Sequence, residues 1–130
     1  MRTGLWPDAD EEHARDIDAY FANASRVLAT FVTDRGDGSL AGFLEAGTRA
    51  YAEDCESSPV AFIEGWWVDE DVRRTRIGAQ LVEAAEAWAR SLGLTEIASD
   101  AILANEISHA AHRALGYQEA TRIVCFRKPL

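Results

Sequence analysis

The stretch "RRTRIGAQLVEAAEAWA", residues 73–89, places three arginines directly before a helical pattern. Apolar residues recur at helical spacing from Leu81 to Leu92, and Gly93 provides a natural stop, so an amphipathic helix is predicted to begin at Ile77. A helix start normally attracts acids, because its unpaired N–H groups and the helix dipole make that end positive. Three arginines at this position therefore suggest that an anion binds there.

The alternative is a solvent-exposed arginine cluster whose charge is offset by the acids at positions 69–71. Backbone N–H groups between a strand and a helix can cradle a phosphate, and Gly78 would let the backbone approach a ligand closely. Short phosphate-loop patterns also occur by chance. The local sequence leaves both interpretations open.

The segments around this loop predict one domain, residues 1–130, with an α/β (α+β) fold. A helix is predicted from Asp10 to Phe21, with Ala14, Ile17 and Phe21 on its apolar stripe. Gly65 suggests a bulge or a close backbone approach within a buried strand. Strands are predicted at 26–34, 40–51, 60–68, 95–99 and 119–128, with another helix at 106–115. This order predicts a mixed central sheet flanked by helices.

Composition narrows the possible partners. Thirteen Lys and Arg against 22 Asp and Glu give a net charge of −9, which argues against nucleic acid and is compatible with a cationic ligand. No leader or membrane segment is visible, and Cys55 and Cys125 lack metal-site or redox spacing. Cys125 lies in an apolar run and is predicted to be a core thiol. We expect a cytoplasmic protein without metal or membrane partner.

Four motifs together resemble one known family. Residues 73–89 resemble the acetyl-CoA signature of the GNAT acyltransferases (Arg or Gln, two residues, Gly, one residue, Gly or Ala), and Arg73 and Gly78 match its ends. "LWPD" (5–8), "SSPVAFIEGWWV" (57–68) and "ASDAILANEISHAAHRALGYQE" (98–119) are similar to the aminoglycoside 6'-N-acetyltransferases of that superfamily. The resemblance covers nearly the whole chain and implies the GNAT fold.

Two features depart from the family pattern. Arg76 stands where the signature has its central glycine, so its side chain could hinder the pyrophosphate or lie outward and add a charge. The family's first strand, which precedes "LWPD", is absent from this sequence. We therefore expect a sheet edge that is open or covered by a partner subunit.

The resemblance implies that acetyl-CoA is the co-substrate. The backbone of Trp66 to Val68 would face the pantetheine and thioester, with the Trp66 N–H as oxyanion donor. Asn105 matches a cofactor-contacting residue, although a helix N-cap is an equal alternative. The implied cofactor residues are Trp66, Trp67, Val68, Arg73, Arg74, Thr75, Arg76, Ile77, Gly78, Ala79 and Asn105.

Acceptor binding is expected to use acids and aromatic side chains. Glu64 lies in an otherwise apolar strand and Asp100 ends another, and buried acids are rarely left unpaired. The alternatives are an ion pair for Glu64 and a helix cap for Asp100. By resemblance, Trp6 and Tyr51 pack on sugar rings, and the alternative of plain core packing is stronger for Trp6 than for Tyr51. Glu119 is a weaker acid candidate, and Thr121 replaces another acid of the family.

The resemblance implies acetyl transfer to the 6'-amine of aminoglycoside antibiotics, which confers resistance. Glu64 or Asp100 would relay the proton of the amine, and His112 could protonate the leaving sulfur or merely contact CoA. The alternatives are a GNAT enzyme acting on another small polyamine and a non-catalytic acyl-CoA-binding protein. We also expect a homodimer with Ile123 to Phe126 close to the contact, because the terminal strand is apolar.

Overall fold

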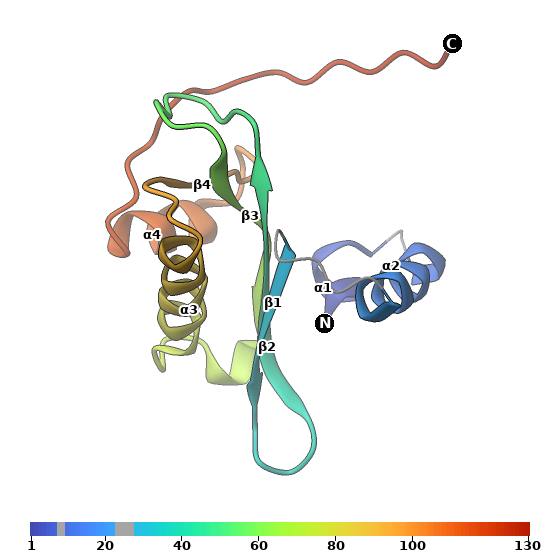
Figure 1. The fold of residues 1–130 in the computed structure, drawn as a ribbon. Coiled ribbons are helices and arrows are strands. Elements are labelled where there is room, and N and C mark those ends of the chain that lie inside the picture. The colour runs from blue at the N-terminus through green and yellow to red at the C-terminus, as the bar shows by residue number, and fades with distance from the viewer. Residues whose placement is uncertain (8–9, 23–27) are drawn as a thin grey trace.

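The computed structural model describes residues 1–7, 10–22 and 28–130, and its centre is a four-stranded mixed sheet in the order β1-β2-β3-β4. The strands are β1 (Leu28–Asp34), β2 (Leu40–Arg49), β3 (Val60–Val68) and β4 (Ile97–Ser99). The helices are α1 (Arg2–Leu5), α2 (Asp10–Ala22), η1 (Glu70–Val72), α3 (Ile77–Ser91) and α4 (Glu106–Ala114). Helices α3 and α4 lie on one side of the sheet, and α1 and α2 lie on the other (Figure 1).

The first three strands form an antiparallel meander. The turn between β1 and β2 contains Gly36 and Gly38 at φ of 86° and 87°, a region that glycine enters without steric cost. β2 and β3 pair along the length of β3, with a register shift in which Glu45 faces Gly65 and Ala46 faces Ile63. Glu64 is thus the extra residue of a β-bulge, as Gly65 suggested.

Helix α3 provides the core contact on one face of the sheet. Its buried residues Leu81, Val82 and Ala85 recur at helical spacing and pack against Leu44, Ala46 and Ile63 of β2 and β3. The helix that the sequence predicted is therefore confirmed. A second buried cluster joins Ala52, Val60 and Phe62 at the other end of β3.

The predicted apolar stripe of α2 is wrong. The Phe21 residue is 80% exposed, and Ile17 is also exposed, whereas His13 is buried. His13 Nε2 lies 3.0 Å from the Trp6 carbonyl oxygen. The short helix α1, which the sequence did not predict, contacts both α2 and β3. Because α1 occupies the sheet surface, α2 docks through the residues that meet α1 and leaves its stripe in solvent.

The predicted terminal strand at 119–128 is also wrong. These residues form no strand and extend away from the body of the molecule (Figure 1). Phe126 is 94% exposed and Cys125 is exposed, so the predicted core thiol is wrong as well. A strand forms only beside another strand, and within the described residues no sheet edge runs alongside this segment.

The open sheet edge that the sequence predicted is present at β1. Among the residues that the structure describes, no strand pairs with its outer side. A shallow hollow beside this edge is lined by Leu28 together with Trp88 and Leu92 of α3. None of the described helices is long and apolar enough to span a bilayer.

The unequal burial of α3 and α2 predicts unequal mutational effects. Leu81 is 3% exposed, so Leu81→Ala should lower the free energy of unfolding by about 2–5 kcal/mol through lost burial and a cavity. Ile17→Ala, on the exposed stripe, should change it by less than about 0.5 kcal/mol. Urea unfolding followed by circular dichroism measures both, and a large loss for Ile17→Ala would show that α2 is buried.

Candidate active site

The central feature of the site is the divergence of β3 and β4. The two strands pair in parallel only through Ala61 to Ile63, and β3 then continues for five more residues. From Glu64 onward, the side of β3 that faces away from β2 has no strand partner among the described residues. An extended ligand could therefore bind to this exposed backbone in place of a strand.

The direction of the N–H groups along this edge follows from one hydrogen bond. The Asp69 N–H donates to the Ala41 carbonyl oxygen (2.9 Å), so the backbone of Asp69 faces β2. N–H groups alternate in direction along a strand, so that of Trp67 also faces β2. The N–H groups of Trp66 and Val68 consequently face the open edge. This placement supports the predicted role of the Trp66 N–H as an oxyanion donor.

The N-terminus of α3 lies close to the end of this edge. The first α-helical hydrogen bond of α3 runs from the Gln80 N–H to the Arg76 carbonyl oxygen, and Arg76 provides no side-chain cap. The preceding N–H groups of Ile77, Gly78 and Ala79 have no partner within the helix. They are the donors that a phosphate at a helix N-terminus uses.

The loop before α3 contains two non-glycine residues with left-handed backbone. Arg74 has a φ of 65° and Arg76 a φ of 72°. This region favours glycine, which explains structurally why a glycine is expected at position 76. The Arg76 side chain is 77% exposed and pairs with Glu83 on the outer surface of α3 (3.4 Å). It therefore lies outward rather than over the N–H groups of the helix start.

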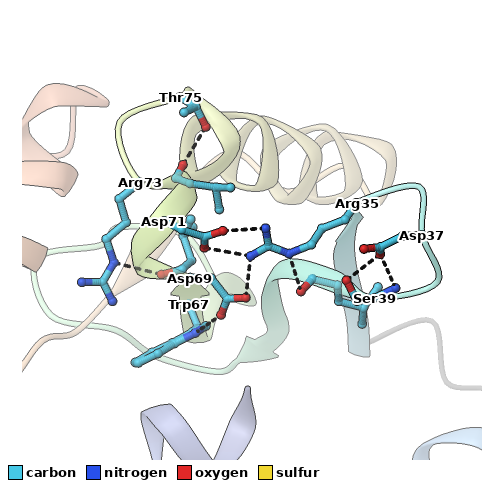
Figure 2. Close-up of polar contacts among 11 residues, drawn as sticks. Arg35, Asp37, Ser39, Trp67, Asp69, Asp71, Arg73 and Thr75 are labelled. Atoms are coloured by element: carbon cyan, nitrogen blue, oxygen red, sulfur yellow. Dashed lines mark hydrogen bonds and ion pairs between the residues drawn. The ribbon is translucent and has the colours of Figure 1, made fainter.

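The other residues of the loop are held by local hydrogen bonds (Figure 2). Arg73 Nε donates to the Val68 carbonyl oxygen (2.9 Å), at the open edge of β3, and its guanidinium carbon lies 5.4 Å from the Trp67 ring centre. The Thr75 hydroxyl donates to the Val72 carbonyl oxygen (2.6 Å). Within the described residues, Arg74 is the one arginine of this loop that forms no ion pair.

Two of the three acids before the loop are paired elsewhere, and the third, Glu70, pairs with Arg73 of the loop (3.5 Å). Arg35, from the β1–β2 turn, contacts Asp69 (2.9 Å) and Asp71 (2.8 Å), and the Trp67 indole N–H donates to Asp69 (3.0 Å; Figure 2). Hydrogen bonds from Trp67 and then Arg35 lower the pKa of Asp69, and Arg35 lowers that of Asp71. Because Arg35 takes two of the three acids, the interpretation that these acids offset the arginine cluster fails for Asp69 and Asp71.

Gly78 has a packing role that the sequence did not reveal. A Cβ at this position would lie 2.9 Å from Cζ2 of the Trp66 indole, closer than side chains tolerate. The glycine therefore allows Trp66 to pack under the start of α3. A closer approach of a ligand to the backbone is compatible with this contact but is not needed to explain the glycine.

The acceptor acids lie at the bulge and after β4. Both oxygens of Glu64 accept hydrogen bonds from Arg49 of β2, so the ion pair that was the alternative for Glu64 is present. Asp100 is exposed and does not cap α4, whose N-cap is Asn105. The structure therefore excludes the cap that was the alternative for Asp100. The hydrogen bond with Glu64, and then the charges of Glu64 and Asp100, raise the pKa of the Arg49 guanidinium.

The two predicted aromatic residues differ in burial. Trp6 packs against Phe43, with 6.3 Å between ring centres, and a Cβ on Gly65 would lie 2.4 Å from its ring. This is the core packing that was the alternative for Trp6. Tyr51, at the opposite extreme, is 67% exposed and free to contact a ligand.

Comparisons with known proteins identify the family to which the chain belongs. The sequence profile of the acetyltransferase (GNAT) family matches residues 1–117. The chain belongs to the GNAT family of acetyltransferases. It is accordingly an acetyl-CoA-dependent N-acetyltransferase.

Within the GNAT family, the chain is similar to one group of named enzymes. An aminoglycoside N(6')-acetyltransferase type 1 of Klebsiella aerogenes is 46% identical over 132 residues, which cover 100% of this chain and 87% of the relative. The structure of AAC(6')-Iy with a bisubstrate analogue, CoA-S-monomethyl-acetylneamine, has a TM-score of 0.92 at 36% identity and covers 100% and 88% of the two chains. AAC(6')-Ih from Acinetobacter baumannii has a TM-score of 0.89 at 38% identity and covers 99% and 87%.

In this GNAT domain, His112 belongs to a partly buried aromatic group between α3 and α4. Its ring centre lies 5.4 Å from those of both Trp66 and Tyr117. His112 Nδ1 donates to the Ser108 carbonyl oxygen (2.8 Å), so the proton of the neutral ring lies on Nδ1. His112 Nε2, Trp66 Nε1 and the Tyr117 hydroxyl are buried without a partner among the described residues, and burial raises the pKa of Tyr117.

The side chains of the remaining predicted site residues are bonded to other groups of the protein. Asn105 is the N-cap of α4, because its side-chain oxygen accepts from the Ser108 N–H (3.1 Å). The helix-cap alternative is therefore present for Asn105. Glu119 pairs with Arg122 (2.6 Å), which lowers the pKa of Glu119, and Thr121 donates to Asp54. No cluster of His, Cys, Asp or Glu in the described part of the chain is arranged to hold a metal.

Sequence reasoning missed two arginines. Arg35 binds the acids before the cofactor loop, and Arg49 binds a predicted acceptor acid. Neither position lies in a motif, and both partners are 15 or more residues away in sequence. The only available signal was the general rule that a half-buried acid has a cationic partner.

The left-handed backbone of Arg76 predicts a stabilising substitution. Arg76→Gly should raise the free energy of unfolding by about 1 kcal/mol, because glycine adopts this φ without steric cost. CoA affinity should change less than about threefold, because the guanidinium lies outward beside Glu83 and loss of one exposed charge is screened. Thermal unfolding and CoA titration measure the two effects. A tenfold loss of CoA affinity would instead make Arg76 a phosphate ligand.

Proposed function

We propose that this acetyltransferase transfers the acetyl group of acetyl-CoA to the 6'-amine of aminoglycosides and thereby confers resistance to them. The observation that carries the proposal is that the open backbone edge of β3, which would bind the cofactor, adjoins the acids that would bind the acceptor. The Trp66 and Val68 N–H groups lie on the open edge of β3, and Glu64 lies at the bulge of the same strand. We further propose a cytoplasmic location, which the free thiols favour.

The cofactor half of the site binds and polarises the thioester. The N–H groups of Ile77, Gly78 and Ala79 receive the pyrophosphate, and Arg74 adds a free positive charge beside them. The open edge of β3 beyond Glu64 would hold the pantetheine arm in place of a strand. The Trp66 N–H then donates to the thioester oxygen and stabilises the negative charge that develops there.

The acceptor half of the site binds cations and receives a proton. An ammonium group must lose a proton before it attacks a carbonyl carbon. Glu64 is bound by Arg49 through both oxygens, whereas Asp100 forms no hydrogen bond through its carboxylate in the described chain. Asp100 is therefore the better proton acceptor, directly or through water, and Glu64 contributes to cation binding.

We propose that His112 contacts acetyl-CoA near its sulfur. Its neutral ring has a bare Nε2, because the Nδ1 proton is donated to Ser108. It can protonate a leaving thiolate only after Nε2 has gained a proton. In the neutral form, Nε2 accepts a hydrogen bond from an amide or thiol of the cofactor.

The two acceptor acids should differ in effect. Asp100→Asn should raise the aminoglycoside KM by about 10-fold to 150-fold, the loss of one charge-assisted contact, and should also lower kcat. Glu64→Gln should have a smaller effect, because Arg49 already neutralises Glu64. Acetyl transfer from acetyl-CoA to kanamycin and tobramycin measures both, and CoA binding by thermal shift is the control. An unchanged KM in Asp100→Asn would remove Asp100 from the site.

We also propose that the enzyme is a homodimer. The extended segment at its C-terminus exposes apolar side chains, including Ile123, Val124 and Phe126. Exposed apolar side chains on an unpaired extended segment favour addition to a sheet edge of a second copy. The partner copy would then provide the strand neighbour that residues 119–128 lack within one chain.

The dimer has a direct test. Light scattering at micromolar concentration should give about twice the mass of the 14.3 kDa chain, and Phe126→Asp should shift the equilibrium to monomer by placing a charge in the contact. Phe21→Asp, at another exposed aromatic position, is the matched control and should leave the mass unchanged. A folded wild-type monomer would contradict the proposal.

A further inference from the structure

Arg49, at the end of β2, is held by three contacts. Its Nε donates to Glu64 Oε1 (3.0 Å), and a second guanidinium nitrogen donates to Oε2. Its guanidinium carbon lies 3.4 Å from the centre of the Phe62 ring. The two hydrogen bonds and the ring stacking together fix the plane of the guanidinium, a geometry that lysine cannot reproduce.

Acids from three separate segments contribute to the electrostatic environment of this one cation, and Glu64 alone contacts it among the described residues. Glu64 belongs to the bulge of β3, Asp100 follows β4, and Glu53 lies in the loop after β2. The pKa of Arg49 is raised by the hydrogen bond with Glu64 and by the charges of Glu64, Asp100 and Glu53. Asp100 and Glu53 form no ion pair in the described residues. The rim of the acceptor site is thus an acidic cluster with one cation already bound.

We propose that Arg49 is a specificity-determining residue: an internal cation that competes with the ammonium groups of the acceptor for the acidic rim. This inference rests on the proposed function, because it assumes that the acceptor binds beside Glu64 and Asp100. No motif of the sequence includes Arg49, and only the bidentate contact across β2 and β3 reveals it.

The competition selects acceptors by their number of positive charges. A monoamine that reaches Glu64 only replaces one cation by another, so it gains little binding free energy. A polycation can place further ammonium groups near Asp100 and Glu53, which have no cation bound at hydrogen-bond distance. Arg49 therefore weakens the binding of small monoamines more than that of polyamines with several ammonium groups, so its effect is a relative preference for polyamines.

The experiment compares Arg49→Met with wild type by calorimetry on the CoA-bound enzyme, with kanamycin and with 6-amino-6-deoxyglucose as a monoamine. Met retains an apolar contact with Phe62 but removes the charge. Arg49→Met should bind kanamycin about threefold to tenfold more tightly, the effect expected for one partly screened charge a few ångströms away. The monoamine should gain affinity by a larger factor, so the preference for the polycation should narrow.

Two further variants distinguish the effect of the Arg49 charge from effects on its geometry or on the fold. Arg49→Lys keeps the charge without the planar fork and should restore the affinities to within about twofold of wild type. Arg90→Met removes an equal charge from an exposed pair with Glu86 on α3 and should leave all affinities unchanged. Thermal unfolding shows whether Arg49→Met remains folded, and Arg49→Lys supplies the comparison if it does not.

Several results would overturn the proposal. Equal or weaker kanamycin binding by Arg49→Met would mean that Arg49 only holds Glu64 in place, and kanamycin binding to neither protein would also contradict it. If Arg49→Met does not fold, at least tenfold weaker kanamycin binding by Arg49→Lys would mean that the fork, not the charge, matters. A wild-type enzyme that binds kanamycin without acetylating it would refute the proposed function, while the calorimetric comparison would still decide the role of Arg49.

Discussion

The bulge of β3 at Glu64 and Gly65 is the constraint on which the rest of the site depends. One extra residue in β3 shifts its register against β2, and pairing with β4 ends at the same point. Beyond it, the N–H groups of Trp66 and Val68 are left on an open edge. The bulge also presents Glu64 to Arg49 and leaves at Gly65 the space that the Trp6 ring fills. Backbone geometry thus places both halves of the proposed active site in one strand.

Charge is distributed by long-range pairing rather than by local sequence. The acids at 69 and 71 stand next to the arginine-rich loop in sequence but are bound by Arg35 from the β1–β2 turn. Because Arg35 binds them, these two acids do not pair with the arginines before α3. At the proposed acceptor rim, long-range pairing instead lowers the negative charge, because Arg49 pairs with Glu64.

The helices and strands that the sequence predicted best are those that bury one face against the sheet. β3 has the predicted bounds, 60–68, and α3 begins at Ile77 as its period indicated. The segments whose packing or pairing depends on another segment far away in the sequence were predicted less well. The α2 stripe is exposed because the unforeseen α1 lies against the sheet, and residues 119–128 form no strand because none of the described strands pairs with them.

By itself, the sequence determined the order of the elements from α2 to α4 and the family to which the chain belongs. Periodicity and local motifs encode these properties within about 20 residues, so no tertiary contact is needed to read them. Only the tertiary structure decided how the candidate residues are used. Asn105 became a helix cap, Arg76 turned outward to Glu83, and Glu64 was bound by Arg49. Each outcome depends on which side chains meet across strands and helices, and a linear sequence does not specify those distances.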